Sequence, residues 1–523
     1  MDSTFFVLFN TVVFLCLSYV YCKNALHMFQ QQRYEVYRYS KWLTNKNNIK
    51  FSVSLLYCAI VLALSLLLNG KIQYWLIMII SIGSAILFIY SELKKEYIQA
   101  LNITARVKRQ IVVMTILDVV SIYLANHFLP AGFVGISAVV MPYILIFPLA
   151  YITMPIEELI KKRYENEARE KLASLDNLHT IGITGSYGKT TTKNVVNDII
   201  SQSFLTCITP ASYNTPMGIT RTVRENLKPI HEVFVCEMGA DKVGDISYLM
   251  DFVKPKYGVV TSIGPQHLHT FLKLENIIKE KMQEIEKLPK DGVGFINLDN
   301  EYIAKYKIKN KCKVVSVGIT NTKADYVAKN VKYTKEGSSF TVKIKNKNYK
   351  FATSLLGQHN VTNVLIGIAI ALELGIEPNK VVKAVSCINQ VTHRLEVKRI
   401  NGYTFIDDSF NANPVGSKMS LDVLSIMNGK RVIVTPGMID LGVKEDDANR
   451  EFGRYMKGRA DYVILVGERQ TKAIHRGLEE SGFNMNNVYV LKTVKQAFNL
   501  IYSKFSIKDT ILLENDLPDA FNV

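Results

Sequence analysis

The segment Gly182-Ile-Thr-Gly-Ser-Tyr-Gly-Lys-Thr-Thr191 follows an apolar run and opens a stretch with helical spacing. Glycines in such a turn let backbone N–H groups approach a phosphate, and the N-terminus of the following helix adds positive potential. Lys189 can neutralise the β- and γ-phosphates of a nucleotide, and the hydroxyl of Thr190 can bind Mg²⁺. The segment therefore predicts a phosphate-binding loop, with shorter glycine spacing than the general G-x-x-x-x-G-K-[ST] pattern. A plain turn is the alternative.

Apolar β-rich runs alternate with amphipathic stretches on the C-terminal side of this loop. Runs such as HTIGITG, EVFVCEMGA, YGVVTSI and DGVGFINL alternate with stretches such as VVNDIISQ and ISYLMDFV. Strands that alternate with helices predict a mainly parallel sheet covered on both faces. Residues 311–355 read instead as short strands with turns, which predicts an antiparallel insertion or edge.

A second series of strands and helices begins near residue 392, with RVIVTPG, DYVILVG and TILLEN among its strands. The alternation predicts another, smaller α/β domain of a Rossmann-like type. We therefore expect a P-loop ATPase domain with a parallel sheet at residues 180–392, followed by the smaller domain at residues 393–523.

The N-terminal part of the chain is apolar over longer stretches. Five windows are almost free of charge: Thr4–Cys22, Phe51–Asn69, Ile72–Ser91, Ile111–Phe128 and Leu129–Pro155. Each has about the 20 residues that a helix needs to cross a hydrocarbon core. Residues 1–155 are therefore predicted to form a membrane domain with five transmembrane helices. The charge-rich segment 156–179 reads as a helical linker to the soluble part.

Lysines and arginines cluster on one side of these windows. The loop between the second and third windows holds Lys71. The segments after the first, third and fifth windows, which lie on the other side, hold Lys23, Arg33, Arg38, Lys41, Lys46, Lys50, Lys94, Lys95, Arg106, Lys108, Arg109, Lys161, Lys162 and Arg163. Such an excess of positive charge marks the cytoplasmic side of a membrane. We therefore expect a multi-pass protein of the cell membrane, with its N-terminus outside and its catalytic domains in the cytoplasm. Anionic lipid head groups account for the net charge of +17, so the lipid bilayer is an expected partner and nucleic acid is not.

Two of the windows carry a further expectation. The first has no positively charged leader and no small-residue cleavage site, so we interpret it as a retained anchor and not as a signal peptide. The fourth contains Asp118, whose carboxylate has either a functional role or a role in helix packing.

Further motifs follow the phosphate loop in order along the chain. They are Cys236-Glu-Met-Gly-Ala240, Ile263-Gly-Pro-Gln-His267-Leu-His-Thr-Phe271, Leu274-Glu-Asn-Ile-Ile-Lys-Glu-Lys281, Leu356-Gly-Gln-His-Asn360-Val-Thr-Asn363, His393-Arg394-Leu-Glu396 and Ile406-Asp-Asp-Ser-Phe-Asn-Ala-Asn-Pro414. Together with the loop they resemble the motifs of the Mur ligase family, which uses ATP to build peptide bonds onto cell-wall precursors of peptidoglycan. The resemblance covers about residues 180–445 and is strongest to the family members that add D-alanyl-D-alanine.

The resemblance implies a nucleotide site that is assembled from several motifs. It assigns the phosphates of ATP to the loop residues Gly185, Ser186, Tyr187, Gly188, Lys189, Thr190 and Thr191. It assigns the adenine side to Asn360 and Asn363, the γ-phosphate to Arg394 and the ribose to Asp408. It implies that Mg²⁺ is held by Thr190, Glu237, His267 and a carbamylated Lys281. It gives catalytic roles to Lys189, His267, Lys281 and Arg394, and substrate contacts to Asn214, Asn411 and Asn413.

Each of these residues has a structural alternative when it is taken alone. His267 could be an ordinary surface or core histidine, Lys281 a lysine on a solvated helical face, and Asp408 the cap of a turn. The joint order and spacing of the motifs favour the site over these alternatives.

The reaction that these residues suit is the joining of a carboxylate to an amine. A carboxylate is a poor electrophile, so transfer of the γ-phosphoryl group of ATP first converts it into an acyl phosphate, which the amine then attacks. Lys189, Arg394 and Mg²⁺ are the cations expected to hold the charge of the phosphates. We therefore expect an ATP-dependent acid–amino acid ligase that releases ADP and phosphate. Its substrates would be a small-molecule amino donor and a carboxylate acceptor.

The sequence departs from the family on the substrate side. The family's N-terminal domain, which binds the uridine nucleotide of a soluble precursor, does not fit into the 25 residues from 156 to 180. Ile219-Thr220 follows Ser212-Tyr-Asn-Thr-Pro-Met-Gly218 where the family continues with G-x-P, and Leu512-Leu-Glu-Asn-Asp-Leu-Pro518 stands in place of a Lys-Gly-Ser segment. We therefore expect an acceptor that is lipid-linked or presented at the membrane, with simple tethering of a cytosolic ligase as the alternative.

Two other functions stay open at this point. A ligase of the same superfamily that extends a γ-linked polyglutamate chain at the membrane would share the phosphate loop, but it fits the segment Ile406–Pro414 less well. A P-loop ATPase coupled to transport would carry a Walker B element or an ABC-type signature, and the sequence shows neither.

Overall fold

The computed structural model describes residues 3–44, 52–67, 71–93, 100–129, 131–266, 268–410, 412–439, 441 and 444–516. The chain divides into two compact units, a helical one up to Lys162 and an α/β one over Arg163–Leu517. The apolar windows therefore lie in the helical unit, and the phosphate loop and the motifs that follow it lie in the α/β unit.

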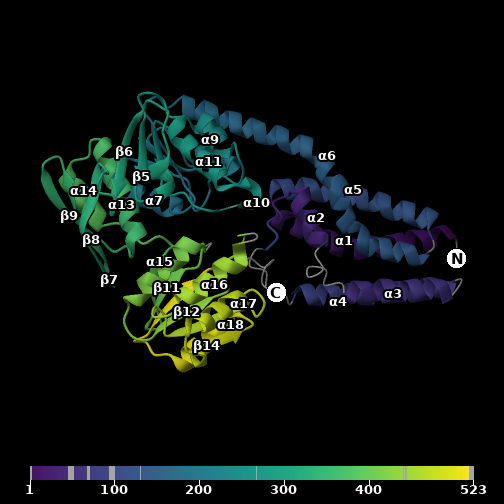
Figure 1. Cartoon of the computed structure of the whole chain (residues 1–523). Coiled ribbons are helices and arrows are strands. Elements are labelled where there is room, and N and C mark those ends of the chain that lie inside the picture. Colours follow the sequence, from purple (N-terminus) through teal and green to yellow (C-terminus); the bar gives the residue numbers. More distant parts are fainter. Residues whose placement is uncertain are drawn as a thin grey trace. The chain divides into compact units, whose positions relative to one another are not determined.

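The helical unit consists mainly of apolar helices (Figure 1). Its elements are α1 (Ser3–Gln31), α2 (Val36–Thr44), α3 (Ser52–Leu67), α4 (Lys71–Leu93), α5 (Ala105–Phe128) and the first part of α6 (Ala131–Ala173). Each predicted window falls on one of these helices. Within the described ranges, three stretches are long and apolar enough to cross a membrane: Thr11–Gln31, Ala105–Phe128 and Phe133–Ala173. The crossing itself, and the larger number of spans, stay predictions.

Polar side chains pair with one another between the apolar helices. Ser18 on α1 donates a hydrogen bond to the carboxylate of Asp118 on α5 over 2.6 Å. Asn126 on α5 donates to the hydroxyl of Thr11 on α1 over 2.9 Å. Asp118 is buried, and a buried carboxylate needs such a partner. Its contacts are therefore those of the helix-packing alternative.

α6 is one continuous helix of 43 residues, and it contains Pro142, Pro148 and Pro155. The predicted linker is therefore the C-terminal part of this helix, with no break at residue 156. In the helical unit, Arg109 donates to both carboxylate oxygens of Glu157 over 2.8 and 2.9 Å. In the α/β unit, the Tyr248 hydroxyl donates to Glu165 over 2.5 Å. Each unit thus holds its own part of the helix by charged or polar contacts.

The α/β unit begins with a large sheet of strand order β2-β3-β1-β4-β5-β6-β7-β8-β9. The strands are β1 (His179–Thr184), β2 (Thr206–Ile208), β3 (Val233–Glu237), β4 (Tyr257–Val260), β5 (Val293–Asn297), β6 (Lys313–Gly318), β7 (Tyr326–Thr334), β8 (Gly337–Ile344) and β9 (Lys347–Thr353). Pairing is parallel from β2 through to β7 and antiparallel among β7, β8 and β9. The predicted antiparallel edge is confirmed for β7–β9 and wrong for β6. That strand pairs in parallel with β5, because helix α12 (Glu301–Lys305) lies between them and brings the chain back in the same direction.

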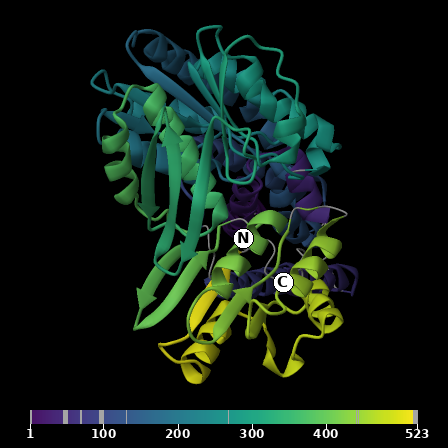
Figure 2. The same ribbon diagram turned by 60° about the vertical axis from the view of Figure 1, so that its left-hand side comes forward.

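Helices cover both faces of this sheet, as expected (Figure 2). Besides α12 they are α7 (Lys189–Ile200), α8 (Pro216–Glu225), α9 (Asp245–Val253), α10 (Leu268–Phe271), α11 (Leu274–Glu286), α13 (Gln358–Glu373) and α14 (Pro378–Ser386). Neighbouring residues of a strand point to opposite faces. Val235 of β3 belongs to the core beneath α7 and α13, whereas Phe234 belongs to the core beneath α8, α9 and α11. Burial on both faces explains the unbroken apolar runs of the parallel strands.

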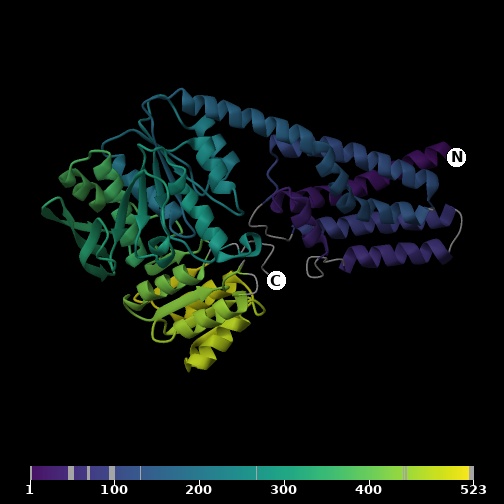
Figure 3. The same ribbon diagram turned by 45° about the horizontal axis from the view of Figure 1, so that its top comes forward.

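A second, smaller sheet follows with strand order β10-β11-β15-β12-β13-β14 (Figure 3). Its strands are β10 (Glu396–Ile400), β11 (Tyr403–Asp408), β12 (Arg431–Thr435), β13 (Tyr462–Val466), β14 (Val488–Leu491) and β15 (Thr510–Glu514). Its helices are α15 (Pro414–Ser425), α16 (Glu445–Tyr455), α17 (Lys472–Ser481), the short η2 (Met485–Asn487) and α18 (Val494–Lys504). β10 is antiparallel to β11, and the other pairs are parallel. The expected second α/β fold is therefore present.

Candidate nucleotide and ligase site

The turn between β1 and α7 has the backbone that the sequence predicts for a phosphate-binding loop. Gly185 and Gly188 have φ angles of 150° and 82°, in the region that favours glycine. A side-chain carbon at Gly185 would lie 2.1 Å from the hydroxyl oxygen of Thr261, so the position has no room for another residue. Gly188 is the N-cap of α7, which places the loop at the positive end of that helix.

The segment after β4 holds this loop in place. The backbone N–H of Ser186 donates to the carbonyl oxygen of Ser262 over 2.7 Å, and the Ser186 hydroxyl donates to that of Gly264 over 3.0 Å. The Thr261 hydroxyl donates to the carbonyl oxygen of Tyr187 over 2.5 Å. Because β1 and β4 are neighbouring parallel strands, their carboxyl ends bring the two segments together.

Lys189 begins α7, and its amine lies against the loop. Nζ donates to the carbonyl oxygens of Gly185 and Ser186 over 2.8 and 3.3 Å. Burial lowers the pKa of Lys189, and the negative charge of Glu237 opposes that shift. Thr190 and Thr191 follow in the first turn of the helix. The loop therefore carries positive charge at the place where the sequence predicts the phosphates.

Glu237 at the end of β3 is held from two sides. Asn214 donates to Oε1 over 3.0 Å, and Lys193 donates to Oε2 over 3.3 Å. The side chains of Glu237 and Lys193 are each 1% exposed. Lys193 was not among the predicted residues, although it follows Lys189 by about one helical turn and therefore points to the same side of α7.

Lys281 lies on α11 and is buried, so the alternative of a solvated helical face is wrong. Burial, strengthened by the positive charge of Lys189, lowers the pKa of Lys281 to about 7. Glu280 beside it accepts bonds from the backbone N–H groups of Gly244 and Ile246 over 2.8 and 2.6 Å. A substantial share of the Lys281 amine is therefore unprotonated at neutral pH, which is the form that reacts with CO₂.

A cavity of about 320 Å³ opens next to the loop and is lined from both sheets. Its walls include seven of the predicted residues: Tyr187, Gly188, Thr191, Asn363, Arg394, Asp408 and Asn413. Motifs separated by more than 200 residues thus meet at one cavity, as the resemblance implies. Asn413 also caps α15, where its side chain accepts a bond from the N–H of Gly416 over 2.8 Å.

Asn360 does not line this cavity, although the sequence places it on the adenine side with Asn363. Its amide donates to the carbonyl oxygen of Leu356 over 2.8 Å, and its side-chain oxygen accepts from Asn363 over 3.2 Å. Asn363 in turn accepts a bond from the Thr192 hydroxyl over 3.0 Å. Asn360 is therefore a buried support for Asn363, and its contact with the adenine stays a prediction.

Arg394 reaches the cavity from an unusual stretch of backbone. Its neighbours His393 and Leu395 have φ angles of 59° and 51°, a left-handed conformation that is rare for residues other than glycine. Its Nη1 donates to the carbonyl oxygen of Phe410 over 2.9 Å, and its guanidinium lies 4.4 Å from the centre of the Phe410 ring. Burial raises the pKa of Asp408, and the charge of Arg394 opposes that shift.

The cavity wall also contains residues that the sequence did not predict, His359 and Glu514 among them. His359 lies inside the predicted adenine motif, and its Nδ1 has no hydrogen-bond partner among the described residues. Burial lowers its pKa to about 4, so the ring is neutral at pH 7. Glu514 at the end of β15 accepts bonds from the hydroxyls of Ser417 and Ser420 over 2.6 and 2.5 Å. It occupies the segment where the family has Lys-Gly-Ser, and that difference was the available signal.

A second group of titratable side chains lies near the start of the smaller sheet. His393, Glu396 and Asp407 come close enough to one another to hold a metal ion. Lys398 donates to Asp407 over 2.6 Å and pairs with Glu396 over 2.9 Å. Its ammonium already forms ion pairs with both carboxylates, so we assign the metal chemistry to the phosphate loop and not to this group.

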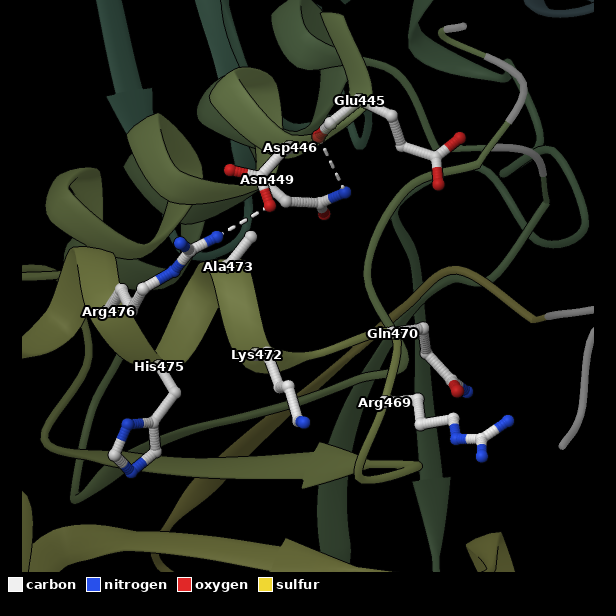
Figure 4. Close-up of a pocket in the computed structure, with 9 residues that line it drawn as sticks. All are labelled: Glu445, Asp446, Asn449, Arg469, Gln470, Lys472, Ala473, His475 and Arg476. Atoms are coloured by element: carbon white, nitrogen blue, oxygen red, sulfur yellow. Dashed lines mark hydrogen bonds and ion pairs between the residues drawn. The ribbon is translucent and has the colours of Figure 1, made fainter. Parts of the chain in front are cut away.

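A larger cavity of about 530 Å³ lies elsewhere in the smaller α/β domain, between α16 and α17 (Figure 4). Figure 4 shows Arg476 reaching across to Asp446, a pair whose nitrogen and oxygen are 2.6 Å apart. The amide of Asn449 donates to the carbonyl oxygen of Glu445 over 3.0 Å. None of the predicted nucleotide residues within the described ranges lines this cavity, so the nucleotide is assigned to the smaller one.

The predicted ligands fit Mg²⁺ and a nucleotide as far as they are described. The hydroxyl of Thr190 and the carboxylate of Glu237 are oxygen donors of the kind that Mg²⁺ takes. Lys189 and Arg394 supply the positive charge that a polyphosphate needs. His267 and Asn411 lie outside the described residues.

Comparison with known proteins identifies the family. Two protein-family profiles match, "Mur ligase middle domain" over residues 183–371 and "Mur ligase, glutamate ligase domain" over residues 393–514. The chain is 31% identical over 293 residues to the UDP-N-acetylmuramoyl-tripeptide–D-alanyl-D-alanine ligase of Bacillus subtilis, covering 55% of this chain and 62% of that protein. It therefore spans less than two thirds of the length of that relative. The enzyme of the same name from Buchnera aphidicola is 30% identical over 352 residues, covering 66% of this chain and 74% of that protein.

Solved structures show the same fold. The structure of MurF from Acinetobacter baumannii superposes with a TM-score of 0.61 at 24% identity, covering 68% of this chain and 77% of that one. MurF ligase from Thermotoga maritima in complex with ADP superposes with a TM-score of 0.62 at 21% identity, covering 69% and 81%. Because both profiles match in order and the Buchnera relative is covered over more than two thirds of its length, the chain belongs to the Mur ligase family.

Proposed function

We propose that this protein is an ATP- and Mg²⁺-dependent ligase of the cell membrane that joins the carboxylate of a cell-wall precursor to an amine. The observation that carries the proposal is the meeting of the phosphate loop, Arg394 and Asp408 at one cavity. A ligase must bring together a nucleotide and two further substrates, and a cavity with walls from two domains offers room for them.

The side chains divide the chemistry among them. Lys189 and Arg394 bring positive charge to the β- and γ-phosphates, where negative charge develops during phosphoryl transfer. An oxygen of the acceptor carboxylate attacks the γ-phosphorus, and the bond to ADP breaks. The neutral amine then attacks the carbonyl carbon of the acyl phosphate and loses one proton to the solvent, and inorganic phosphate leaves with the bonding electron pair. Thr190, Glu237 and His267 are the residues that would hold Mg²⁺, which shields the charge of the phosphates when bound.

Lys281 suits carbamylation because its amine is buried and its pKa is lowered to about 7. The unprotonated amine forms a bond to the carbon of CO₂ and loses one proton, which converts a cation into an anion. That anion would stand near the positive charge of Lys189 and contribute a ligand to the metal. The proposal therefore assigns Lys281 to the metal side of the site.

We infer that the acceptor is lipid-linked or presented at the membrane. Three stretches within the described ranges are long and apolar enough to cross a bilayer, and the basic residues cluster on one side of the apolar windows. This supports an N-terminus outside and catalytic domains in the cytoplasm. Confinement to the membrane raises the effective concentration of any lipid-borne substrate. The relatives named above are ligases for a UDP-linked tripeptide, so a soluble acceptor is the competing case.

The test is a screen for phosphate release by the full-length enzyme in detergent, with Lys189→Ala as the control for contaminating ATPases. Amino acids and dipeptides, D-alanyl-D-alanine among them, are supplied with either a UDP-linked or an undecaprenyl-linked precursor, and products are identified by mass spectrometry. We expect donor-dependent phosphate release with the lipid-linked acceptor and a new amide in the lipid fraction. Equal rates with the soluble precursor would contradict the membrane-presented acceptor. ATP hydrolysis with no amide product would contradict the ligase.

A further inference from the structure

We propose that Lys193 is a positioning residue that ties the loop of residues 209–215, which carries the predicted substrate residue Asn214, to the nucleotide site through Glu237. The inference rests on the proposed function, because it takes Glu237 as a ligand of the metal. It concerns how that ligand is held, and it names a residue that no sequence motif had assigned.

Lys193 is one of the largest fully buried side chains of the described structure. Its ammonium donates to Oε2 of Glu237 over 3.3 Å and to the carbonyl oxygen of Ala211. A lysine is rarely buried unless its charge is paired. These two contacts thus join three separate parts of the chain: helix α7, the end of strand β3 and the loop that contains Ala211.

The loop needs such a contact because of its backbone. Ala211 has a φ of 44°, in the left-handed region that an alanine seldom adopts. The surrounding structure must hold a residue in this conformation. The carbonyl oxygen of Ala211 itself accepts the bond from Lys193. The ammonium therefore holds the loop at the residue with the unfavourable backbone conformation.

The same loop carries Asn214, which was predicted to contact the substrate. Its amide donates to Oε1 of Glu237 over 3.0 Å, and its carbonyl oxygen accepts from the N–H of Gly239 over 2.8 Å. A side-chain carbon at Gly239 would lie 2.7 Å from the side-chain oxygen of Asn214, so the loop packs closely on the chain after β3. The two oxygens of Glu237 are therefore held by different elements, one by α7 and one by the loop.

The consequence is a coupling between the two sides of the site. Lys189 and Lys193 share helix α7, so the phosphate loop, the carboxylate of Glu237 and Asn214 are fixed relative to one another. Loss of the ammonium would free one oxygen of Glu237 and the carbonyl oxygen of Ala211, while leaving the glycine turn intact. The geometry therefore predicts that Lys193 controls the response to Mg²⁺ and not the intrinsic affinity for the nucleotide.

The experiment measures the binding of a fluorescent ADP analogue to the full-length protein in detergent, with and without Mg²⁺. This readout needs no acceptor and no turnover. In the wild type, Mg²⁺ should tighten binding. In Lys193→Met we expect that gain to fall by at least about tenfold, because a buried carboxylate has lost its cation. Affinity without Mg²⁺ should change by less than about threefold. The control is Lys305→Met, which removes the exposed partner of Glu301 on α12.

Two further variants separate positioning from simple support of the fold. Lys193→Arg keeps the charge and should retain most of the Mg²⁺ response, even if Lys193→Met does not fold. Ala211→Gly relaxes the left-handed residue; added to Lys193→Met, it should restore thermal stability without restoring the Mg²⁺ response. An unchanged response in a folded Lys193→Met protein would overturn the inference, as would full recovery by Ala211→Gly. A wild type whose nucleotide binding ignores Mg²⁺ would overturn the proposed function and the inference with it.

Discussion

The substitution Glu284→Gln removes a buried carboxyl group while keeping its shape. Glu284 lies on α11 with no exposed surface, and its two oxygens have no hydrogen-bond partner among the described residues. A side-chain carbon on Gly182 of β1 would lie 2.1 Å from Oε1, so the carboxyl group packs directly against the strand. Burial raises the pKa of Glu284 to about 8, and the charge of Lys281 offsets part of that shift. The folded chain therefore holds this group as a neutral acid at pH 7.

The sign of the effect on stability follows from the raised pKa. The folded chain keeps the proton up to about pH 8, whereas the unfolded chain loses it near the ordinary pKa of 4.5. Between these values the folded state binds more protons, so the free energy of unfolding falls as the pH rises. Glutamine has no such proton. At about 1.36 kcal/mol per pKa unit, the free energy of unfolding of the variant should rise relative to that of the wild type by about 3 kcal/mol as the pH is raised from about 5.5 to about 8.5.

The assay is thermal or urea unfolding of both full-length proteins, monitored by circular dichroism at several pH values across that range. The matched control is Glu275→Gln, an exposed position on the same helix, where we expect a change within about 0.5 kcal/mol and no trend with pH. If the stability difference between Glu284→Gln and the wild type does not change across that pH range, the pKa of the carboxyl group is not raised in the folded state, and the reasoning is refuted.

Three other substitutions test the site. Lys189→Ala should lower ATP turnover by on the order of 10²–10³, because a preorganised charge is lost at the phosphates, with circular dichroism unchanged; near-normal turnover would contradict the loop assignment. Lys281→Ala should be inactive and partly rescued by acetate or formate in the phosphate-release assay, since a small carboxylate can replace the carbamate; an active variant would exclude carbamylation. Asn360→Ala should cost about 1–3 kcal/mol in urea unfolding, because it leaves the Leu356 carbonyl unpaired, and it should weaken nucleotide binding only through Asn363. Loss of binding without loss of stability would support a direct contact between Asn360 and the adenine.

The sequence predicted those parts of the fold that depend on the residues of a single short segment. The parallel strands are buried on both faces, so their apolar runs stand out, as in Val233–Glu237. The direction of β6 could not be read in the same way, because it depends on how the chain returns to the sheet and not on the strand's own residues. Helix α6 crosses the predicted boundary at residue 156, since backbone hydrogen bonds continue whether the side chains are apolar or charged.

The same distinction between local and distant contacts applies to the residues of the site. The phosphate loop was predictable because its glycines and Lys189 act within one turn of chain. Lys193 and Glu284 were not, because their importance lies in partners 44 and 102 residues away and in burial that no short motif records. Asn360 shows what a motif leaves open: the motif gives its position in the chain, but not the hydrogen bonds that join its side chain to the Leu356 carbonyl and to Asn363.

Lys398, set between Glu396 and Asp407, is a counterion that cannot diffuse away. A chelator such as EDTA strips a metal from its carboxylates but leaves a covalently attached ammonium in place. The ion pairs of Lys398 with Glu396 and Asp407, which lie close in sequence to Arg394, should therefore persist at any concentration of divalent cation. A loss of activity on chelation should therefore not arise from these two ion pairs.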